Sequence, residues 1–384
     1  MKILGLIFTR NVSLETWIKT GLLEREIEIY KLYICKNIFD KIFLFTYGTN
    51  DSFYLEDLRK KEKIYEKIEV IGIPKYLNFY FGKIIYSFIL SIINMKKIKK
   101  CTIIKTNQID GAWSIILIKF LFNKKIIVRC GYILSIFNEK TNKNKILRNK
   151  CFKKLEKLSL NFSDKIVVSS KADKKYFIEE YTINEKKISQ IYNYINLKKF
   201  KENMKFDFDK NNFVFVGRLT ESKNIISLVE SAKELGVCLD IYGDGLLKEK
   251  LKKIIGKDNK KIKLLGKIPN DELAKELRRY NYYILPSFIE GTPKTLLEAM
   301  ASGLICIGSN IEGTNEIINK ERGFLINGFD KESIKNTIKD IILLNSEKKS
   351  VIRKNGVKFI KENFSLEAYF KTEKEIIMEL MNAK

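Results

Sequence analysis

Short apolar runs alternate with longer helical patterns along the whole chain, and this alternation restricts the possible folds more than any other feature. Segments such as Leu14–Ile34 and Phe81–Met95 are long enough to be crossover helices between strands. Strands that alternate with helices predict parallel sheets covered by helices on both faces. In the first half the expected strands are Lys2–Phe8, Lys41–Tyr47, Lys67–Ile73, Thr102–Thr106, Lys125–Arg129, Lys165–Ser169 and Lys187–Ile191. In the second half they are Phe213–Val216, Leu239–Tyr242, Ile262–Leu265, Tyr282–Leu285, Ile305–Gly308 and Gly323–Ile326.

The length of 384 residues predicts two domains, because single hydrophobic cores rarely grow beyond about 250–300 residues. The segment Asn193–Asn212 is polar, has no clean period and precedes the first strand of the second set, so it marks the boundary. We therefore expect two doubly wound α/β domains, over residues 1–196 and 197–364. Ser365–Met381 is expected to form a last helix, whose apolar face at helical spacing comprises Leu366, Phe370, Ile376, Ile377 and Leu380.

Several classes of site are excluded or disfavoured by residue usage. The chain has no histidine, which excludes His-based metal sites, catalytic triads and His general bases. Its six cysteines are scattered without a C-x-x-C pair, as expected of reduced thiols in a cytoplasmic protein. Asp207-Phe-Asp209 has the letters of a metal-binding D-x-D motif, but it lies in the linker and not after a strand. The N-terminal apolar run is too short for a signal peptide, and no run approaches the roughly 18 residues of a membrane span.

The net charge is +26 and is concentrated in the first half of the chain. Residues 1–200 contain 39 Lys+Arg and 19 Asp+Glu, whereas residues 201–384 contain 33 and 27. Lys96–Lys100 and Lys140–Lys157 are the densest basic clusters, and the second follows the apolar run Tyr132–Phe137. A basic surface confined to one half suggests an acidic partner, such as anionic lipid, nucleic acid or a phosphorylated substrate. The alternative is a solvated charged face.

Glu290 and Glu298 lie eight positions apart, across a Gly-Thr-Pro turn that follows an apolar run. Gly291 permits a sharp turn, and Pro293 suits the first position of a helix. A helix N-terminus presents unpaired N–H groups and the positive end of its dipole, which together suit a diphosphate. With two carboxylates for hydroxyl groups, the segment fits a sugar nucleotide. The alternative is an ordinary strand–turn–helix segment with two solvated glutamates.

Other strands of the second half are followed by residues that could complete such a site. Arg218 and Lys223 follow Phe213–Val216 and could neutralise a diphosphate, although in a lysine-rich chain they could also be plain surface cations. Gly243-Asp-Gly245 reads as a structural turn. The backbone of 266–272, which includes Ile268, could hold a base edge, and Asn270 or Asp271 could cap the following helix.

Four motifs follow these strands in a fixed order, and the series closely resembles the retaining glycosyltransferases of family 4, which have the GT-B fold. The motifs are Gly217-Arg-x4-Lys223, Gly243-Asp-Gly245, Leu265-Gly-x-Ile268 and Pro286-Ser-x2-Glu-Gly-x-Pro-x4-Glu-Ala-Met-Ala-x-Gly303. The resemblance covers residues 210–345, and the motifs together are specific. The first half resembles the family mainly in layout.

The resemblance implies two Rossmann-like domains that face across a cleft, with the donor on the second and the last helix (365–384) packing back on the first. Arg218 and Lys223 would hold the donor diphosphate. Glu290 would lie by the hydroxyls of the transferred sugar, and Glu298 would accept hydrogen bonds from both ribose hydroxyls. The backbone contacts implied are Gly291, Thr292 and Lys294 near the sugar and Thr295 and Leu296 at the distal phosphate. No metal or other cofactor is expected, since arginine, lysine and a helix dipole can neutralise the leaving diphosphate.

The chain departs from the family on the acceptor side. Many members carry a histidine in the first domain that faces the sugar or acceptor, and this chain has Cys130-Gly-Tyr132 after the corresponding strand. The N-terminal loop at Arg10–Trp17 also lacks the glycines common in the family. Acceptor-side roles therefore do not carry over from the family. Our own candidates follow the expected strands and are Arg10, Glu15, Lys105, Asn107, Gln108 and Arg129, for which helix caps and salt bridges are the alternative reading.

These inferences predict a retaining glycosyltransferase that moves a hexose-type sugar from a nucleoside diphosphate, with a UDP-sugar favoured over a GDP-sugar. The expected acceptor is a glycan or a lipid-diphosphate-linked glycan of bacterial cell-surface polysaccharide synthesis. The chain is expected in the cytoplasm, peripheral on the inner membrane face through the two basic clusters. One alternative is a sugar-nucleotide epimerase or hydrolase of the same fold, which the missing histidine disfavours. The other is a basic nucleic-acid-binding protein, which lacks a recognisable fold signature.

Overall fold

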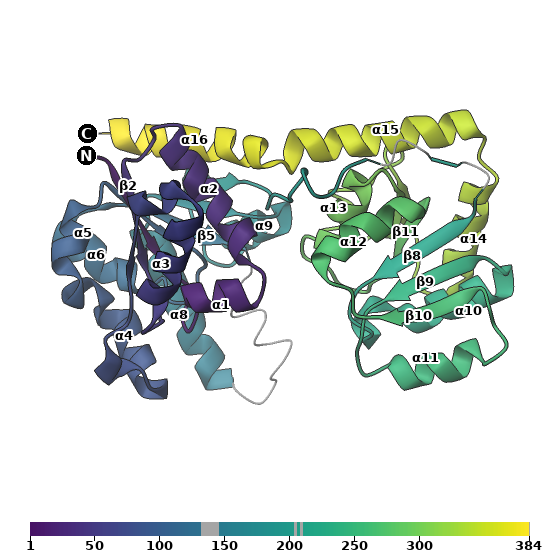
Figure 1. The fold of residues 1–384 in the computed structure, drawn as a ribbon, viewed down its shortest axis with the longest axis horizontal. Coiled ribbons are helices and arrows are strands. Elements are labelled where there is room, and N and C mark those ends of the chain that lie inside the picture. Colours follow the sequence, from purple (N-terminus) through teal and green to yellow (C-terminus); the bar gives the residue numbers. More distant parts are fainter. Residues whose placement is uncertain (132–145, 203–205, 208–209, 384) are drawn as a thin grey trace. The chain divides into compact units, whose positions relative to one another are not determined.

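The computed structural model describes residues 1–131, 146–202, 206–207 and 210–383 and divides into two compact units. The first unit comprises Met1–Asn193 with Tyr369–Lys384, and the second comprises Tyr194–Ala368. Each unit is built on one sheet whose strand pairs are all parallel. The predicted α/β fold of two doubly wound parallel sheets is thus confirmed (Figure 1).

The first unit has a seven-stranded sheet of order β3-β2-β1-β4-β5-β6-β7. Its strands are β1 (Ile3–Ile7), β2 (Lys41–Phe45), β3 (Ile68–Ile71), β4 (Ile103–Thr106), β5 (Lys125–Cys130), β6 (Lys165–Val168) and β7 (Ile188–Gln190). Its helices are α1 (Leu14–Lys19), α2 (Leu23–Cys35), α3 (Asp51–Lys61), α4 (Tyr80–Ile93), α5 (Met95–Lys100), α6 (Ser114–Phe122), α8 (Ile146–Phe162), α9 (Lys171–Glu179) and most of α16 (Leu366–Asn382). The central strands are buried on both faces, which explains their nearly continuous apolar runs.

The second unit has a six-stranded sheet of order β10-β9-β8-β11-β12-β13. Its strands are β8 (Asn212–Val216), β9 (Cys238–Tyr242), β10 (Ile262–Gly266), β11 (Tyr282–Leu285), β12 (Ile305–Ser309) and β13 (Phe324–Ile326). Its helices are α10 (Ile225–Leu235), α11 (Lys248–Ile255), α12 (Asn270–Glu276), α13 (Lys294–Ala301), α14 (Lys331–Ile342) and α15 (Ser346–Asn363). α10 packs against α11 and α14, whereas α13 packs against α15, and the two groups cover opposite faces of the sheet (Figure 1).

The segment Leu14–Ile34, which is long enough for crossover helices, forms the two helices α1 and α2. Gly21 lies between them with φ +68°, a left-handed conformation that ends a helix and favours glycine. Ser13 caps α1 by accepting a hydrogen bond from the Thr16 N–H, and the Thr16 hydroxyl accepts from the Ser13 N–H in return. The short helix is thus fixed by its own sequence rather than by the length of the segment.

All six cysteines are free. Among the described residues no helix is both long and apolar enough to cross a bilayer. The same part of the chain contains no group of three Cys, Asp or Glu side chains that could hold a metal ion. Tyr132–Phe137, the first part of Lys140–Lys157 and Asp209 lie outside the described residues.

Candidate active site

The strand order of the second unit places its topological switch point between β8 and β11. From β8 the chain moves outward to β9 and β10, then returns to β11 on the other side and continues to β12 and β13. The loops that follow β8 and β11 therefore leave the sheet edge in opposite directions. In open α/β sheets, ligands bind in the crevice that this divergence opens at the carboxyl ends of the strands.

The loops after β8 and β11 are joined by a direct ion pair between two predicted site residues. Lys223, in the short 3₁₀ helix Glu221–Lys223, lies with its Nζ 2.5 Å from Glu290 Oε1. The same carboxylate oxygen accepts a hydrogen bond from the Ser287 hydroxyl at 2.6 Å. The backbone also connects the loops, because the Phe288 N–H donates to the Ser222 carbonyl at 2.9 Å. Two residues that lie 67 positions apart in sequence thus share one site.

Arg218 is positioned differently from Lys223. Its side chain is exposed, and no ion pair joins it to any residue that the structure describes. The Arg218 loop is held through its neighbours, since the Gly217 N–H donates to the Tyr242 carbonyl and the Leu219 N–H donates to the Asp244 carbonyl. The loop after β8 thus carries both the exposed Arg218 guanidinium and Lys223, which pairs with Glu290.

The start of α13 is fixed to the ends of β8 and β11. The Thr295 hydroxyl donates to the Val216 carbonyl at 3.2 Å and accepts from the Tyr283 hydroxyl at 2.6 Å. Burial raises the pKa of Tyr283 well above its ordinary value, so the hydroxyl remains a donor. The sequence predicted Pro293 at the first helical position, and this prediction is wrong. Pro293 is instead the N-cap residue, where its ψ of 100° is still extended.

The N–H groups at this helix start are only partly available to a ligand. Lys294 and Thr295 are the first two helical residues, whose N–H groups have no intrahelical acceptor. Leu296 differs, because its N–H already donates to the Pro293 carbonyl at 3.1 Å. Gly291 is exposed and Thr292 half-buried in the turn before the helix.

Glu298 is nearly inaccessible to solvent, with an exposed fraction of 1%, yet two donor side chains contact its carboxylate. Lys294 Nζ lies 3.0 Å from Glu298 Oε1, and the Asn270 side-chain amide donates to the same oxygen at 3.2 Å. Neither Asn270 nor Asp271 caps α12, because the N-cap is Pro269 and no side chain fills that role. Asn270 instead links the loop after β10 to the predicted ribose-binding residue, a contact that was not expected from the sequence. Ile268 lies half-buried two residues earlier in this loop.

The Gly243-Asp-Gly245 turn has a structural role, as the sequence suggested. The Gly243 N–H donates to the Gly266 carbonyl at 2.8 Å. A Cβ at Gly243 would lie 1.8 Å from the Gly217 carbonyl oxygen, so only glycine allows this approach. The turn thereby aligns the loops that follow β8, β9 and β10.

The loop after β12 also supports the site, although no sequence motif pointed to it. Gly313 has φ +85°, and a Cβ there would lie 1.7 Å from the Gly291 carbonyl oxygen. Gly313 therefore packs directly against the turn between Glu290 and α13. A glycine shortly beyond a strand of the sheet was the available sign of this contact.

Substitution of Gly313 by alanine tests that support. We expect the substitution to destabilise the second unit by about 1–3 kcal/mol and to weaken ligand binding, because it combines left-handed strain with a backbone clash. Gly256→Ala is the matched control, since Gly256 has φ +81° but no atom within 4 Å of the position that a methyl group would take. Thermal unfolding by circular dichroism measures both variants, and equal losses would contradict a role for the Gly291 contact.

The candidates in the first unit are mostly engaged in internal contacts. Arg10 pairs with Asp110 at 3.3 Å, and Glu15 pairs with Lys19 at 2.7 Å and accepts from Tyr54. Gln108 accepts a hydrogen bond from the Gly131 N–H at 2.7 Å. Asn107 differs, because it is buried and its Oδ1 has no hydrogen-bond partner among the described residues. It is thus the first-unit candidate with an unused acceptor.

Two of these candidates were expected to follow their strands but lie within them. Lys105 belongs to β4 and Arg129 to β5. Lys105 is buried against Glu373 of α16, with 2.6 Å between Nζ and Oε1. Arg129 lies 3.6 Å from Glu26 and donates to the Asn193 side chain at 2.6 Å. Both side chains are therefore part of the packing of the first unit rather than its strand-end loops.

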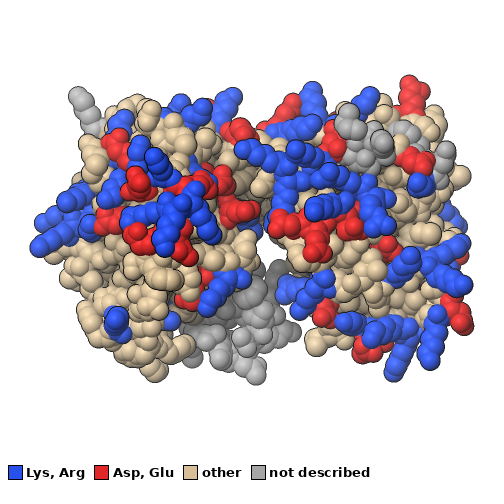
Figure 2. Space-filling model, viewed as in Figure 1, with Lys and Arg blue, Asp and Glu red and all other residues tan. Residues whose placement is uncertain are grey.

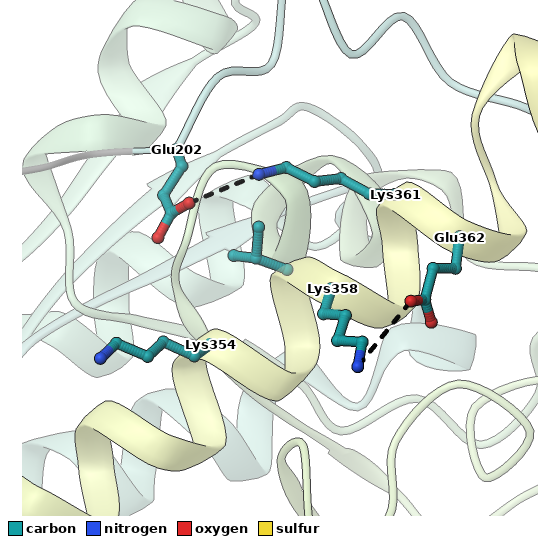
Figure 3. A pocket seen from close by; sticks show the side chains of 6 residues that line it. Glu202, Lys354, Lys358, Lys361 and Glu362 are labelled. Atoms are coloured by element: carbon teal, nitrogen blue, oxygen red, sulfur yellow. Dashed lines mark ion pairs between the residues drawn. The ribbon is translucent and has the colours of Figure 1, made fainter.

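A pocket of about 340 Å³ lies beside α15 (Figure 3). Four of its five charged side chains form two ion pairs, Lys361 with Glu202 at 3.7 Å and Lys358 with Glu362 at 3.9 Å. Lys354 and Val357 complete the lining, and the pocket contains none of the predicted site residues. The internal ion pairs favour a solvated surface feature over a ligand site.

Residues 197–359 match the sequence profile of "Glycosyl transferases group 1". The matched residues lie within the second unit. The whole chain has the GT-B fold, which solved structures similar to it share. Anabaena HepE, crystallised with UDP, has a TM-score of 0.73 at 17% identity and covers 99% of this chain and 100% of its own. Sucrose-phosphate synthase from Thermosynechococcus elongatus has a TM-score of 0.74 at 18% identity, over 100% of both chains.

Two curated glycosyltransferases show more sequence similarity. One is the Escherichia coli UDP-Gal:alpha-D-GlcNAc-diphosphoundecaprenol alpha-1,3-galactosyltransferase, 34% identical over 208 residues. That match covers 49% of this chain and only 53% of the relative, about half of its length. The other is the Staphylococcus aureus capsular polysaccharide biosynthesis glycosyltransferase CapH, 26% identical over 330 residues, which cover 83% of this chain and 88% of CapH.

Proposed function

We propose that this chain is a glycosyltransferase, which transfers a hexose-type sugar from a nucleoside diphosphate to a glycan or lipid-diphosphate-linked acceptor with retention of the anomeric configuration. The observation that carries the proposal is the Lys223–Glu290 pair at the switch point of the second sheet. It joins a cation suited to the diphosphate with a carboxylate suited to sugar hydroxyls. The proposed reaction belongs to bacterial cell-surface polysaccharide synthesis.

The cations would act on the leaving diphosphate. Arg218 is exposed and can bind two phosphate oxygens through its planar fork, while Lys223 would exchange part of its interaction with Glu290 for a phosphate oxygen. The N–H groups of Lys294 and Thr295 at the start of α13 add donors and the positive end of the helix dipole. These groups favour the charge that develops as the glycosidic bond to the diphosphate breaks. The chemistry therefore requires no metal ion in this proposal.

The two glutamates would have separate tasks. Glu290 would accept hydrogen bonds from hydroxyls of the transferred sugar and orient it, with the backbone of Gly291 and Thr292 nearby. Glu298 would accept from the two ribose hydroxyls, after the Lys294 ammonium moves from its carboxylate toward phosphate. The Asn270 amide would stay on Glu298 and hold its orientation. Ile268 and its neighbours would contact the base.

Retention follows in the proposal from attack on the same face that the diphosphate leaves. Among the described residues of the second unit, the other carboxylate of the motif, Glu298, is buried against Lys294 and Asn270 and is not placed as a nucleophile for the opposite face. The donor phosphate oxygen would then receive the proton from the acceptor hydroxyl. Asn107, whose Oδ1 is unpaired, is the first-unit residue that we propose on the acceptor side.

The names of the relatives support the choice of donor and acceptor class. HepE was crystallised with UDP, and the galactosyltransferase from Escherichia coli is named for a UDP-sugar donor and a diphosphoundecaprenol-linked acceptor. CapH is named for capsular polysaccharide synthesis. We therefore favour a UDP-sugar over a GDP-sugar and an acceptor with a lipid diphosphate. Attraction of an acidic membrane surface by Lys96–Lys100 and Lys140–Lys157 is part of the proposal, although Lys153 already pairs with Glu180.

A thermal-shift panel of UDP, GDP and their sugar derivatives tests the donor site, because a ligand of the native state raises the melting temperature. We expect UDP and at least one UDP-sugar to stabilise the protein. Glu298→Ala should weaken nucleotide affinity by about 10²-fold through loss of two charge-assisted hydrogen bonds. Glu249→Ala, which removes an exposed glutamate of α11, is the control. Equal UDP affinity of the two variants would contradict the assignment of Glu298.

A product assay then separates transfer from other reactions of a sugar nucleotide. Incubation with the stabilising donor and a lipid-diphosphate-linked sugar should give a new glycosidic bond with unchanged anomeric configuration. Glu290→Ala should reduce turnover more than nucleotide affinity. A changed or hydrolysed sugar nucleotide without a glycosidic product would instead indicate an epimerase or hydrolase.

A further inference from the structure

The outer face of α4 is apolar, although it faces solvent. Phe81, Ile85, Phe88 and Ile92 recur at intervals of four, three and four residues, which puts them on one side of the helix. Their exposed fractions are 68%, 47%, 38% and 50%. The solvent side of a helix in a globular domain normally carries charged and polar residues. This helix therefore has an apolar stripe that the core of the first unit does not use.

The opposite side of α4 is already packed, so the stripe does not result from a rotated helix. Tyr86 and Leu90 are fully buried members of the hydrophobic core. Ser87 is buried between them and accepts a hydrogen bond from the Trp113 indole N–H at 2.8 Å. Turning the helix to bury the stripe would expose these residues and break that bond. The residues of the apolar stripe are thus not needed to complete the core of the first unit.

The exposed apolar surface extends into the turn that precedes the helix. Tyr76, Phe79 and Tyr80 are all exposed, and the rings of Tyr80 and Phe81 pack edge to face with 5.3 Å between their centroids. We call Tyr76, Phe79, Tyr80, Phe81, Ile85, Phe88 and Ile92 the α4 apolar face. In Figure 2 the part of the first unit around the position of α4 in Figure 1 is almost free of charged residues. Contiguous exposed apolar patches larger than roughly a few hundred Å² usually mark an interaction site.

The charged residues that flank this face in the sequence are all positive. From residue 70 to residue 109 the sequence has seven lysines and no Asp, Glu or Arg. Lys75 is exposed at the start of the face, and Lys96, Lys99 and Lys100 are exposed in α5, directly after α4. Within the part of the chain that the structure describes, Lys97 is the one α5 lysine that pairs with an acid, Glu69. A second copy of this chain would oppose lysines with lysines, whereas an anionic lipid surface offers the opposite charge.

We propose that the α4 apolar face inserts into the headgroup region of an anionic lipid bilayer, with α4 parallel to the membrane plane. Tyrosine and phenylalanine rings suit this region, since one end is apolar and the other faces water, and flanking lysines contact the anionic headgroups. The basic clusters would attract the protein electrostatically, and the apolar face adds insertion. The proposal does not depend on the donor site, which lies in the second unit.

Vesicle flotation of the full chain tests the proposal. Vesicles contain either equal parts phosphatidylcholine and phosphatidylglycerol or phosphatidylcholine alone. We expect the protein to float with the anionic vesicles, and the variant Phe81→Ser/Ile85→Ser/Phe88→Ser to bind them at least about tenfold more weakly. The matched control is Leu246→Ser/Leu343→Ser/Val351→Ser, which removes three exposed apolar side chains from the second unit and should bind like the wild type.

Insertion itself is measured by a tryptophan placed in the face. The signal of the two native tryptophans is subtracted from the fluorescence of each variant. Brominated lipids in anionic vesicles should quench the remaining fluorescence of Phe88→Trp but not that of Leu343→Trp. Circular dichroism and the UDP-induced thermal shift establish that each variant is folded, and a failed UDP shift with intact vesicle binding would count against the donor site alone. Equal flotation of the serine variant and the wild type would overturn the proposal. A wild-type dimer that the serine variant dissociates, without vesicle binding, would overturn it in favour of a second copy.

Discussion

Replacement of Lys223 by alanine is expected to lower kcat by about 10²–10³-fold, with a much smaller change in KM. The reason is that a cation aimed at a leaving diphosphate acts mainly on the charge that develops in the transition state. Lys223 is half-buried at the switch point, where its interaction with charge is stronger than in bulk water. Steady-state rates of sugar transfer, with the donor varied, measure the two constants.

Two further variants separate a catalytic role of Lys223 from a structural one. Lys223→Arg keeps the charge, so it should retain a larger part of the activity than alanine does. Lys267→Ala removes an exposed lysine from the loop after β10 and should be nearly neutral. If Lys223→Ala retained a rate within a few-fold of the wild type, the proposed role at the diphosphate would be wrong.

The second large effect is expected at a buried charge in the first unit. Lys105→Met should lower the free energy of unfolding of this unit by about 3–5 kcal/mol, because it leaves the Glu373 carboxylate buried without its cation. Both side chains are at most 1% exposed, and burial lowers the pKa of Lys105 against the opposing effect of Glu373. Glu373 also accepts hydrogen bonds from the hydroxyls of Tyr33 and Tyr369.

A second substitution tests whether the cost arises from the unpaired carboxylate. Lys105→Met/Glu373→Gln removes the charge but keeps an acceptor for the two tyrosines, so it should recover a substantial part of the loss. Both tryptophans of the chain, Trp17 and Trp113, belong to the first unit, so their fluorescence during urea unfolding reports on this unit. A double variant as unstable as Lys105→Met would show that packing, rather than the unpaired charge, causes the effect.

The same pair explains how the C-terminal helix is attached to the first unit. Glu373 belongs to α16, Lys105 to β4 and Tyr33 to α2. α16 also contributes Phe370, whose ring lies 5.7 Å from that of Tyr33, and Glu379, which pairs with Lys165 of β6. A buried ion pair with two tyrosine donors therefore fixes this helix against the sheet, with apolar contacts on either side.

The predictable part of the fold came from local periodicity. Apolar runs such as Ile3–Ile7 and Phe213–Val216 recur at the spacing of strands, and the segments between them fit helices, so two parallel sheets followed. The break of Leu14–Ile34 into two helices was not predicted, because Gly21 could equally lie inside or between helices until its φ was known. The position of Pro293 depended likewise on a single ψ angle.

The candidate donor site could be partly predicted from the sequence, because its residues follow strands that end at one edge of the sheet. Arg218, Lys223, Glu290 and Glu298 were named on that basis, and the ion pair between Lys223 and Glu290 joins two of their loops. The contacts of Asn270 with Glu298 and of Gly313 with Gly291 could not be predicted from the sequence. Each depends on how closely two neighbouring loops approach, which composition does not specify.

The sequence by itself thus determined the class of fold, and it predicted the edge of the sheet where a ligand would bind and the residue types available there. Only the tertiary structure decided which charges are paired, which glycines support another loop and which apolar side chains are left outside the core. The physical reason is that strands and helices follow from interactions between near neighbours, whereas the partner of Lys105 lies 268 positions away in the chain. The stripe on α4 is another case, because apolar periodicity marks an amphipathic face but does not say whether the core or the solvent receives it.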